Sequence, residues 1–311
     1  MDRQVGLWMY QNGGGTEIES QIIQKLNGKG IGAVKDINLA NAIANNGKII
    51  CNDVAVDELD LFFTYNAGQQ TPFQVYMYET VSSLIPTVNN YNAFRLTEDK
   101  FKTADRLSRA GITCSDHLLV NRNNIEELKK SLADWNFNAI YKPVDGWGGS
   151  GLVKLESERD LDLLLPYFES QSTPEFYVER MIKNDFTDYR VDIVDGQYIA
   201  CYGRAAKAGE WRTNVSSGGH VIPREPTPEI VDLALRAAKA TGLEIAGVDI
   251  IYDVEFDRYV VIEVNGIPAF ATPDQEKIGL NFNSKKIDAI VNLIERTVYS
   301  TTVSNKELAS V

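Results

Sequence analysis

Short apolar runs alternate with helix-like patterns over the first 95 residues. Three runs have the length and composition of buried strands: residues 5–10, 33–37 and 59–65. The spacing of apolar residues predicts a helix over residues 17–26 and a weaker one near 39–45. Because strands that alternate with helices favour a parallel sheet, we expect residues 1–95 to form a small Rossmann-like α/β domain.

The middle of the chain, residues 96–182, is expected to form a separate subdomain. Its helical patterns cover residues 98–110, 124–135 and 157–168. Thr97 is expected to cap the first of these helices, and Pro166 to end or kink the last. Strands are expected at residues 139–144, 152–155 and 176–179, the first two forming a hairpin.

Residues 183–300 predict a sheet with covering helices. Two hairpins are expected, joining residues 190–194 to 197–202 through the turn signal Asp195-Gly196, and residues 248–252 to 259–264. Helices are expected at residues 228–241, where Gly242 follows the last turn, and at 284–298. The polar residues 301–311 are expected to be a mobile tail.

The composition limits the function. A net charge of −12 argues against binding to nucleic acid or to anionic membranes. No apolar run approaches the roughly 20 residues that span a bilayer, and the first residues do not resemble a signal peptide. The three cysteines are widely spaced and there are two histidines, so we expect reduced thiols, a cytoplasmic protein and no histidine-rich zinc site.

A glycine-rich turn follows the strand that contains Lys142. Four glycines lie within the six residues from Gly146 to Gly151. Such a backbone can approach a ligand closely, and its N–H groups together with a nearby ammonium group suit phosphate oxygens. We interpret the turn as a lid over a nucleotide triphosphate. The alternatives are a long hairpin turn and an edge lysine whose ammonium group reaches water.

Three oxygen-bearing side chains are expected on one face of the second hairpin. If that hairpin turns symmetrically about Phe256, Asp249 lies opposite Glu263, and Asn265 shares the face of Glu263. Facing carboxylates repel one another unless a cation lies between them, and oxygen ligands alone favour Mg²⁺. The alternative is a polar, half-exposed hairpin face without a metal.

Charged residues also mark the first hairpin and the segment after it: Asp188, Arg190, Asp192, Arg204 and Arg212. A simple register about the Asp195-Gly196 turn places Arg190 opposite Cys201 and leaves Arg204 on the other face, unless the strand ends or bulges before that residue. We interpret the arginines as candidates for binding phosphate or carboxylate groups, with surface salt bridges as the alternative.

Taken in order over about residues 90–270, these features resemble the ATP-grasp superfamily and, within it, the RimK-like glutamate ligases. The matching pieces are Asp99-Lys100, Tyr141-Lys142-Pro143, the glycine turn, Val178-Glu179-Arg180-Met181, Asp188-Tyr189-Arg190, Gly247-Val248-Asp249 and Glu263-Val264-Asn265. The resemblance implies an ATP-grasp fold, α+β in this part, behind the N-terminal α/β domain. The chain departs from the family at Ser216-Ser217 and at residues 266–270, both on the expected substrate side.

The resemblance also implies roles for individual residues. The residues that would contact the nucleotide are Lys100, Lys142, Gly148, Gly149, Ser150, Gly151, Glu179, Arg180, Met181 and Asp188. Of these, Glu179 and Met181 would contact the adenine through their backbone. Two Mg²⁺ ions, or Mn²⁺ as an alternative, would be held by Asp249, Glu263 and Asn265. The catalytic contacts to phosphate or to the carboxylate substrate fall to Arg190, Arg204, Arg212 and Asn214.

The implied enzyme is an ADP-forming carboxylate–amine ligase that uses ATP and Mg²⁺. A small or peptide-like carboxylate would form an acyl phosphate, and an amino-acid amine, such as that of glutamate, would displace the phosphate. A homo-oligomer is compatible with this family. The alternatives are an ATP-grasp kinase and a non-catalytic ATP-binding protein. The turn Gly13-Gly14-Gly15 lacks the GxGxxG pattern of a dinucleotide site, so we expect it to be a substrate-side loop and rank an NAD oxidoreductase last.

Overall fold

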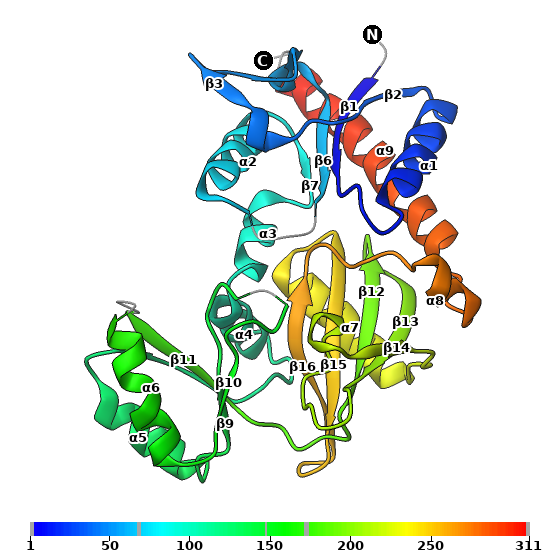
Figure 1. The fold of residues 1–311 in the computed structure, drawn as a ribbon. Coiled ribbons are helices and arrows are strands. Elements are labelled where there is room, and N and C mark those ends of the chain that lie inside the picture. Colours follow the sequence, from blue (N-terminus) through cyan, green and yellow to red (C-terminus); the bar gives the residue numbers. More distant parts are fainter. Residues whose placement is uncertain (1–2, 67–69, 147, 171–173, 309–311) are drawn as a thin grey trace.

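The chain forms three lobes, each built around its own sheet (Figure 1). The structure is a computed structural model that describes residues 3–66, 70–146, 148–170 and 174–308, with side chains described as far as residue 300. Helices and sheets are mixed, so the expected α/β and α+β class is confirmed. Within the described residues, no helix combines the length and apolar character needed to cross a membrane.

The N-terminal lobe contains a parallel sheet in the order β2-β1-β6-β7, as predicted. Its elements are β1 (Arg3–Met9), α1 (Gly15–Gly28), β2 (Ile31–Val34), β6 (Leu61–Tyr65), α2 (Pro72–Leu84) and β7 (Thr87–Val88). Between them lie the 3₁₀ helices η1 (Leu39–Asn41) and η2 (Val56–Glu58) and a small antiparallel sheet of β3 (Ile43–Asn45), β4 (Lys48–Cys51) and β5 (Val54–Ala55). The helix expected near residues 39–45 is therefore wrong. Asn46 and Gly47 both have positive φ and join β3 to β4, a turn that favours a hairpin.

The middle lobe is an antiparallel sheet in the order β10-β9-β11-β8. Its elements are β8 (His117–Asn121), α5 (Ile125–Asp134), β9 (Ala139–Tyr141), β10 (Val153–Leu155), α6 (Glu158–Ser170) and β11 (Glu175–Arg180). Two helices precede this lobe, α3 (Tyr91–Thr97), which packs into the N-terminal core through Phe94, and α4 (Lys100–Arg109), which packs against the C-terminal lobe through Leu107. Thr97 is the last residue of α3, and Asp99 caps α4 by accepting a hydrogen bond from Lys102 N at 2.9 Å, so the predicted cap is wrong. Helix α6 continues past Pro166 to Ser170, so Pro166 does not end it, and Phe168 in its last turn is buried against Tyr141.

The C-terminal lobe is a five-stranded sheet in the order β14-β13-β12-β15-β16. Its elements are β12 (Thr187–Val194), β13 (Gln197–Ala205), η3 (Val215–Ser217), β14 (His220–Ile222), α7 (Pro228–Thr241), β15 (Ile245–Asp253), β16 (Arg258–Asn265), α8 (Pro273–Lys277) and α9 (Asn283–Leu308). Helix α7 has the predicted bounds, with Gly242 in the left-handed conformation after its last turn. Helix α9 extends into the segment that the sequence assigned to a tail.

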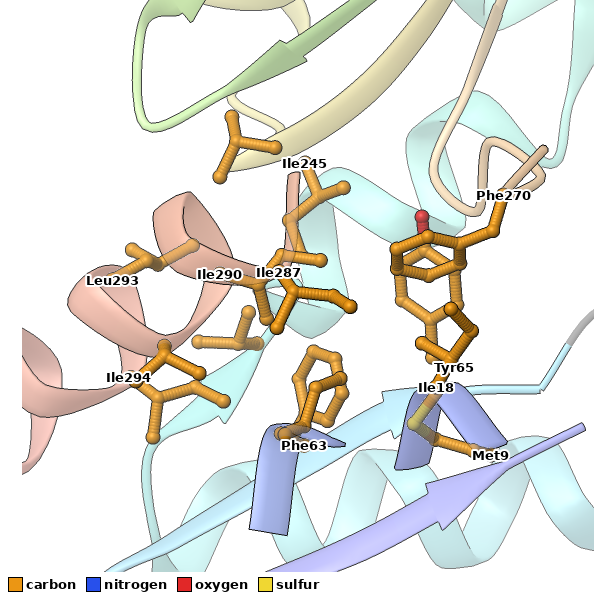
Figure 2. Close-up of a cluster of buried hydrophobic side chains, with 14 of the residues drawn as sticks. Met9, Ile18, Phe63, Tyr65, Ile245, Phe270, Ile287, Ile290, Leu293 and Ile294 are labelled. Atoms are coloured by element: carbon orange, nitrogen blue, oxygen red, sulfur yellow. The ribbon is translucent and has the colours of Figure 1, made fainter. Parts of the chain in front are cut away.

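Helix α9 connects the two ends of the chain. It leaves the C-terminal lobe and passes beside α1 to reach the N-terminal sheet (Figure 1). Figure 2 shows Ile287, Ile290 and Ile294 of α9 in one buried cluster with Phe63 and Tyr65 of β6. The same cluster includes Phe270, which lies in the loop after β16. The N-terminal lobe therefore shares its core with the lobe that carries the predicted metal ligands.

Candidate active site

A deep cleft separates the middle lobe from the C-terminal sheet. It encloses about 900 Å³, counting the part open to solvent, a size within the range of ligand pockets. Most of the predicted site residues line it: Lys100, Lys142, Gly149, Ser150, Glu179, Arg180, Met181, Arg204, Arg212, Asn214, Asp249 and Glu263. Three others, Gly148, Arg190 and Asn265, line an adjoining cavity. The cleft also has an apolar floor, formed in part by Ile251 and Ile262 on the β15–β16 hairpin.

The predicted metal ligands lie together on β15 and β16. Asp249 pairs with Glu263 in the strand register, as expected. Between Asp249 and Ile250 the register shifts by one residue, because β16 carries a bulge at this point and the hairpin turn is not centred on Phe256. The shorter turn and the bulge compensate for one another. Asn265 lies on the same face and its Nδ2 is 3.4 Å from Glu263 Oε2.

A second bulge makes the register of the first hairpin, β12–β13, differ from the expected one. Arg190 pairs with Tyr202 and not with Cys201, because the β12–β13 ladder shifts between Asp192 and Ile193. This shift places Arg204 opposite Asp188 and on the same face as Arg190. The simple register is therefore wrong and the alternative of a bulge is confirmed, so the structure brings both arginines to Asp249.

The arginines form a buried charge network and not surface salt bridges. Arg190 donates to both oxygens of Asp249, with Nη2 at 2.9 Å from Oδ2, and Arg204 Nη2 lies 2.8 Å from the same oxygen. Asp188 lies beneath the cleft, where it accepts hydrogen bonds from Arg204 at 2.6 Å and from Thr213. Burial alone would raise the pKa of Asp249, but Arg190 and Arg204 outweigh it and hold that pKa below its ordinary value.

Lys142 points into the cleft from the end of β9. Its Nζ donates to Glu179 Oε2 at 2.7 Å, and Tyr177 Oη donates to Glu179 Oε1 at 2.7 Å. Burial raises the pKa of Glu179, yet the Lys142 ammonium and the Tyr177 hydroxyl together bring that pKa below its ordinary value. The side chain of Lys142 is largely buried, so the alternative of an edge lysine in water is not what the structure shows.

The glycine turn folds over the cleft and contacts the segment around η3. Gly148, Gly149 and Gly151 all have positive φ, a conformation that favours glycine. Ser216 Oγ donates to Gly148 O at 2.7 Å, and Arg212 Nη1 donates to Gly149 O at 3.3 Å. Gly151 packs against Pro143 behind the turn, and Trp147 lies outside the described residues.

At the end of the cleft where adenine is expected, Arg180 and Met181 already make hydrogen bonds to other protein groups. The Arg180 guanidinium lies within 3.3 Å of Asp116, Asp253 and Glu255, so its charge joins the middle lobe to the β15–β16 hairpin. Met181 N donates to Asn138 O at 2.8 Å. A hydrogen bond from Met181 N to adenine would have to replace that bond.

The donor set at Asp249, Glu263 and Asn265 fits Mg²⁺. Two carboxylates and one amide present hard oxygen atoms toward the junction of the two cavities. Lys100 Nζ lies 3.1 Å from Glu263 Oε1, so cationic side chains balance both carboxylates. Among the residues that the structure describes, no group of three acidic, histidine or cysteine side chains is placed to hold a metal. An ion here would therefore also need oxygen ligands from phosphate or water.

The adjoining cavity begins where the cleft ends. The two share Lys100, Gly146, Arg204, Asn214 and Glu263. Arg190 and Tyr202 line the cavity beside these shared residues, and Val215, Val221, Ile267 and Phe270 give it apolar walls. The sequence did not indicate Val215 and Val221. Ile267 and Phe270 lie within residues 266–270, where the chain departs from the family pattern on the expected substrate side.

Comparisons with known proteins show the family of this chain. The model of the RimK-like ATP-grasp domain matches residues 97–290. The tetrahydromethanopterin:alpha-L-glutamate ligase of Methanocaldococcus jannaschii is 32% identical over 225 residues, which cover 69% of this chain and 74% of that one.

Solved structures show the same fold at lower identity. The D-Ala:D-Ser ligase VanG of Enterococcus faecalis has a TM-score of 0.69 at 18% identity, over 94% of this chain and 99% of its own. The ATP-grasp ligase PsnB, complexed with a minimal precursor, Mg and ADP, has a TM-score of 0.66 at 18% identity, over 94% and 97%. The chain therefore belongs to the RimK-like family of ATP-grasp ligases.

Proposed function

We propose that this chain joins a carboxylate to the α-amino group of L-glutamate and converts ATP to ADP and phosphate. The observation that carries the proposal is the meeting of the two cavities at Asp249, Glu263 and Asn265. A triphosphate in the cleft would end where a carboxylate in the second cavity begins. The choice of glutamate rests on the name of the Methanocaldococcus jannaschii relative, an alpha-L-glutamate ligase.

The nucleotide would lie in the cleft with its adenine toward Met181 and its phosphates toward Lys100 and Lys142. Both ammonium groups face the cleft and can move from Glu263 and Glu179 to phosphate oxygens. The glycine turn, held by Ser216 and Arg212, would cover the phosphates and exclude water, which would otherwise hydrolyse an activated carboxylate.

The reaction has two steps. A carboxylate oxygen of the acceptor attacks the γ-phosphorus of ATP, and ADP leaves. The amino nitrogen of glutamate then attacks the carbonyl carbon of the acyl phosphate, phosphate leaves, and the nitrogen loses its proton. Arg190 and Arg204 would stabilise the negative charge that develops on the transferred phosphoryl group, and they line the junction together with Arg212 and Asn214.

Asp249, Glu263 and Asn265 would hold the metal. We propose two Mg²⁺ ions, which Mn²⁺ can replace, with ATP phosphates completing their ligand shells. The metal supplies charge neutralisation and orientation of the phosphates. For it to bind, Arg190 and Arg204 must release part of Asp249, which they hold in this structure. The release would leave both guanidinium groups free to contact the acceptor or the phosphoryl group.

A coupled assay tests this proposal. The protein is incubated with ATP, Mg²⁺, L-glutamate and a panel of small and peptide-like carboxylates, and ADP, phosphate and amide are quantified by chromatography and mass spectrometry. We expect the three products in equal amounts. AMP with pyrophosphate would contradict the proposal, and a stable phosphorylated product without glutamate would indicate a kinase. Glu263→Gln should abolish turnover, whereas Asp274→Asn, on an exposed residue of α8, should not.

A further inference from the structure

The loop after β16 forms the far wall of the second cavity. Ile267, Ala269 and Phe270 line that cavity, although the loop itself has no regular hydrogen bonding to a strand. Its position depends on side chains from outside the loop: Asn89, Tyr65, Asn283 and Lys286. Asn89 Nδ2 donates to Gly266 O at 2.6 Å, and Asn283 bonds both N and O of Ala271 at 2.8 Å.

Lys286 is the central anchor of this loop. It lies on α9 and is fully buried. Its Nζ donates to Pro268 O at 2.8 Å, to Ala269 O at 3.0 Å and to Asp192 Oδ2 at 2.8 Å. An ammonium group has three N–H donors, and these three acceptors use all of them. Tyr65 Oη also donates to Pro268 O, at 2.5 Å, so β6 of the N-terminal lobe reaches the same carbonyl.

A fully buried lysine is rare in proteins, because removing its charge from water costs free energy. Burial lowers the pKa of Lys286, and the adjacent Asp192 carboxylate opposes that shift. An apolar side chain of similar length would fill the space between the rings of Tyr65, Phe270 and Phe282 without this cost. An apolar side chain could not donate hydrogen bonds to the carbonyl oxygens of Pro268 and Ala269, so it could not hold the loop in this position.

We propose that Lys286 is a positioning residue for the acceptor, because it fixes the loop that carries Ile267 and Phe270 against the substrate. This inference rests on the ligase function proposed above. It assigns to α9 and to the N-terminal lobe a direct part in acceptor selection. The acceptor's carboxylate would face Arg190 and Arg204, and its apolar body would contact the wall that Lys286 holds.

The test compares three variants. Lys286→Met removes the ammonium group. Lys286→Met combined with Asp192→Leu also removes the carboxylate that the first change leaves buried, so it should recover thermal stability. Lys285→Met makes the same change at the neighbouring exposed residue and serves as the control.

Methyl NMR of the free protein tests the anchor without a substrate. We expect the Ile267 and Ala269 methyl signals to shift and broaden in both Lys286→Met variants and to keep their positions in Lys285→Met. The Ile251 methyl signal, from the nucleotide cleft, should stay unchanged in all three. Unchanged Ile267 and Ala269 signals in Lys286→Met would overturn the inference.

Kinetics then test the consequence, with N-benzoyl-L-glutamate and N-acetyl-L-glutamate as acceptor probes. We expect the KM for the benzoyl probe to rise about tenfold in both Lys286→Met variants while the KM for ATP changes less than about twofold. A purely structural role predicts instead that the acceptor KM recovers together with thermal stability in the double variant, and that result would refute the inference. If the wild type turns over neither probe, the NMR result still decides on the anchor, and the assay with the carboxylate panel decides on the proposed function.

Discussion

The two predicted carboxylate ligands should differ sharply in what they contribute to stability. Asp249 is 2% exposed and is held by two guanidinium groups. The Glu263 side chain is 31% exposed, and its ion pair is with Lys100 at 3.1 Å. Asp249→Asn therefore leaves Arg190 and Arg204 buried with one carboxylate, Asp188, between them, whereas Glu263→Gln removes a half-exposed ion pair.

These environments give different magnitudes. Removing one partner of a buried pair costs about 3–5 kcal/mol, whereas an exposed pair contributes about 0–1 kcal/mol. In a chain of this size, about 1 kcal/mol moves the Tm by roughly 2–4 °C. Asp249→Asn should then lower the Tm by roughly 6 °C or more, and Glu263→Gln by no more than roughly 4 °C. Both changes should abolish turnover, because both remove a proposed metal ligand.

Differential scanning fluorimetry without nucleotide or metal measures the change in Tm, and the coupled ADP assay measures the loss of turnover. Circular dichroism confirms that each variant is folded at the assay temperature. Equal Tm losses in the two variants would refute the assignment of the buried charge network. Full activity in either folded variant would refute its role as a metal ligand.

Three further results are expected. Because Lys142 and Tyr177 lower the pKa of Glu179, Glu179 stabilises the fold above the unfolded-state pKa of about 4.3 and loses this effect as the pH falls through its folded-state pKa. The urea midpoint of the wild type should therefore fall on acidification from pH 7, and Lys142→Met should reduce that dependence; an unchanged pH profile would contradict the pairing. Ser216→Ala should raise the KM for ATP by roughly 2- to 10-fold through loss of its bond to Gly148, with Ser217→Ala as the control that leaves it unchanged. Treatment with EDTA should stop ADP release, and Mg²⁺ or Mn²⁺ should restore it; activity in EDTA would exclude the proposed metal role.

The sequence predicted those parts of the site that depend on local pattern. Alternation along a strand placed Glu263 and Asn265 on one face, and the two-residue turn at Asp195-Gly196 placed the first hairpin. A bulge leaves no comparable signal, since it inserts one residue without changing the apolar pattern on either side. One bulge therefore made the Arg190 register wrong, while another compensated for an error in the turn around Phe256.

The sequence also could not predict which residues far apart in the chain form contacts with one another. The sequence marked Lys142 as unusual within an apolar strand but could not pair it with Glu179, which lies 37 residues later on a neighbouring strand. Lys286 gave no signal at all, because on a helix it resembles the exposed Lys285 beside it. Only the packing of α9 against β6 and β12 separates the two lysines.

The path of α9 has a consequence for how this protein folds during synthesis. The apolar faces of β1 and β6 are covered by a helix that the ribosome makes more than 200 residues later, at Asn283–Leu308. Part of the apolar interior of the N-terminal lobe therefore stays exposed until α9 has been synthesised. Domains that fold one by one as they leave the ribosome do not have this delay. We expect a nascent chain stalled before α9 to be a preferred client of chaperones and sensitive to proteases, and release of the full chain to end both states together.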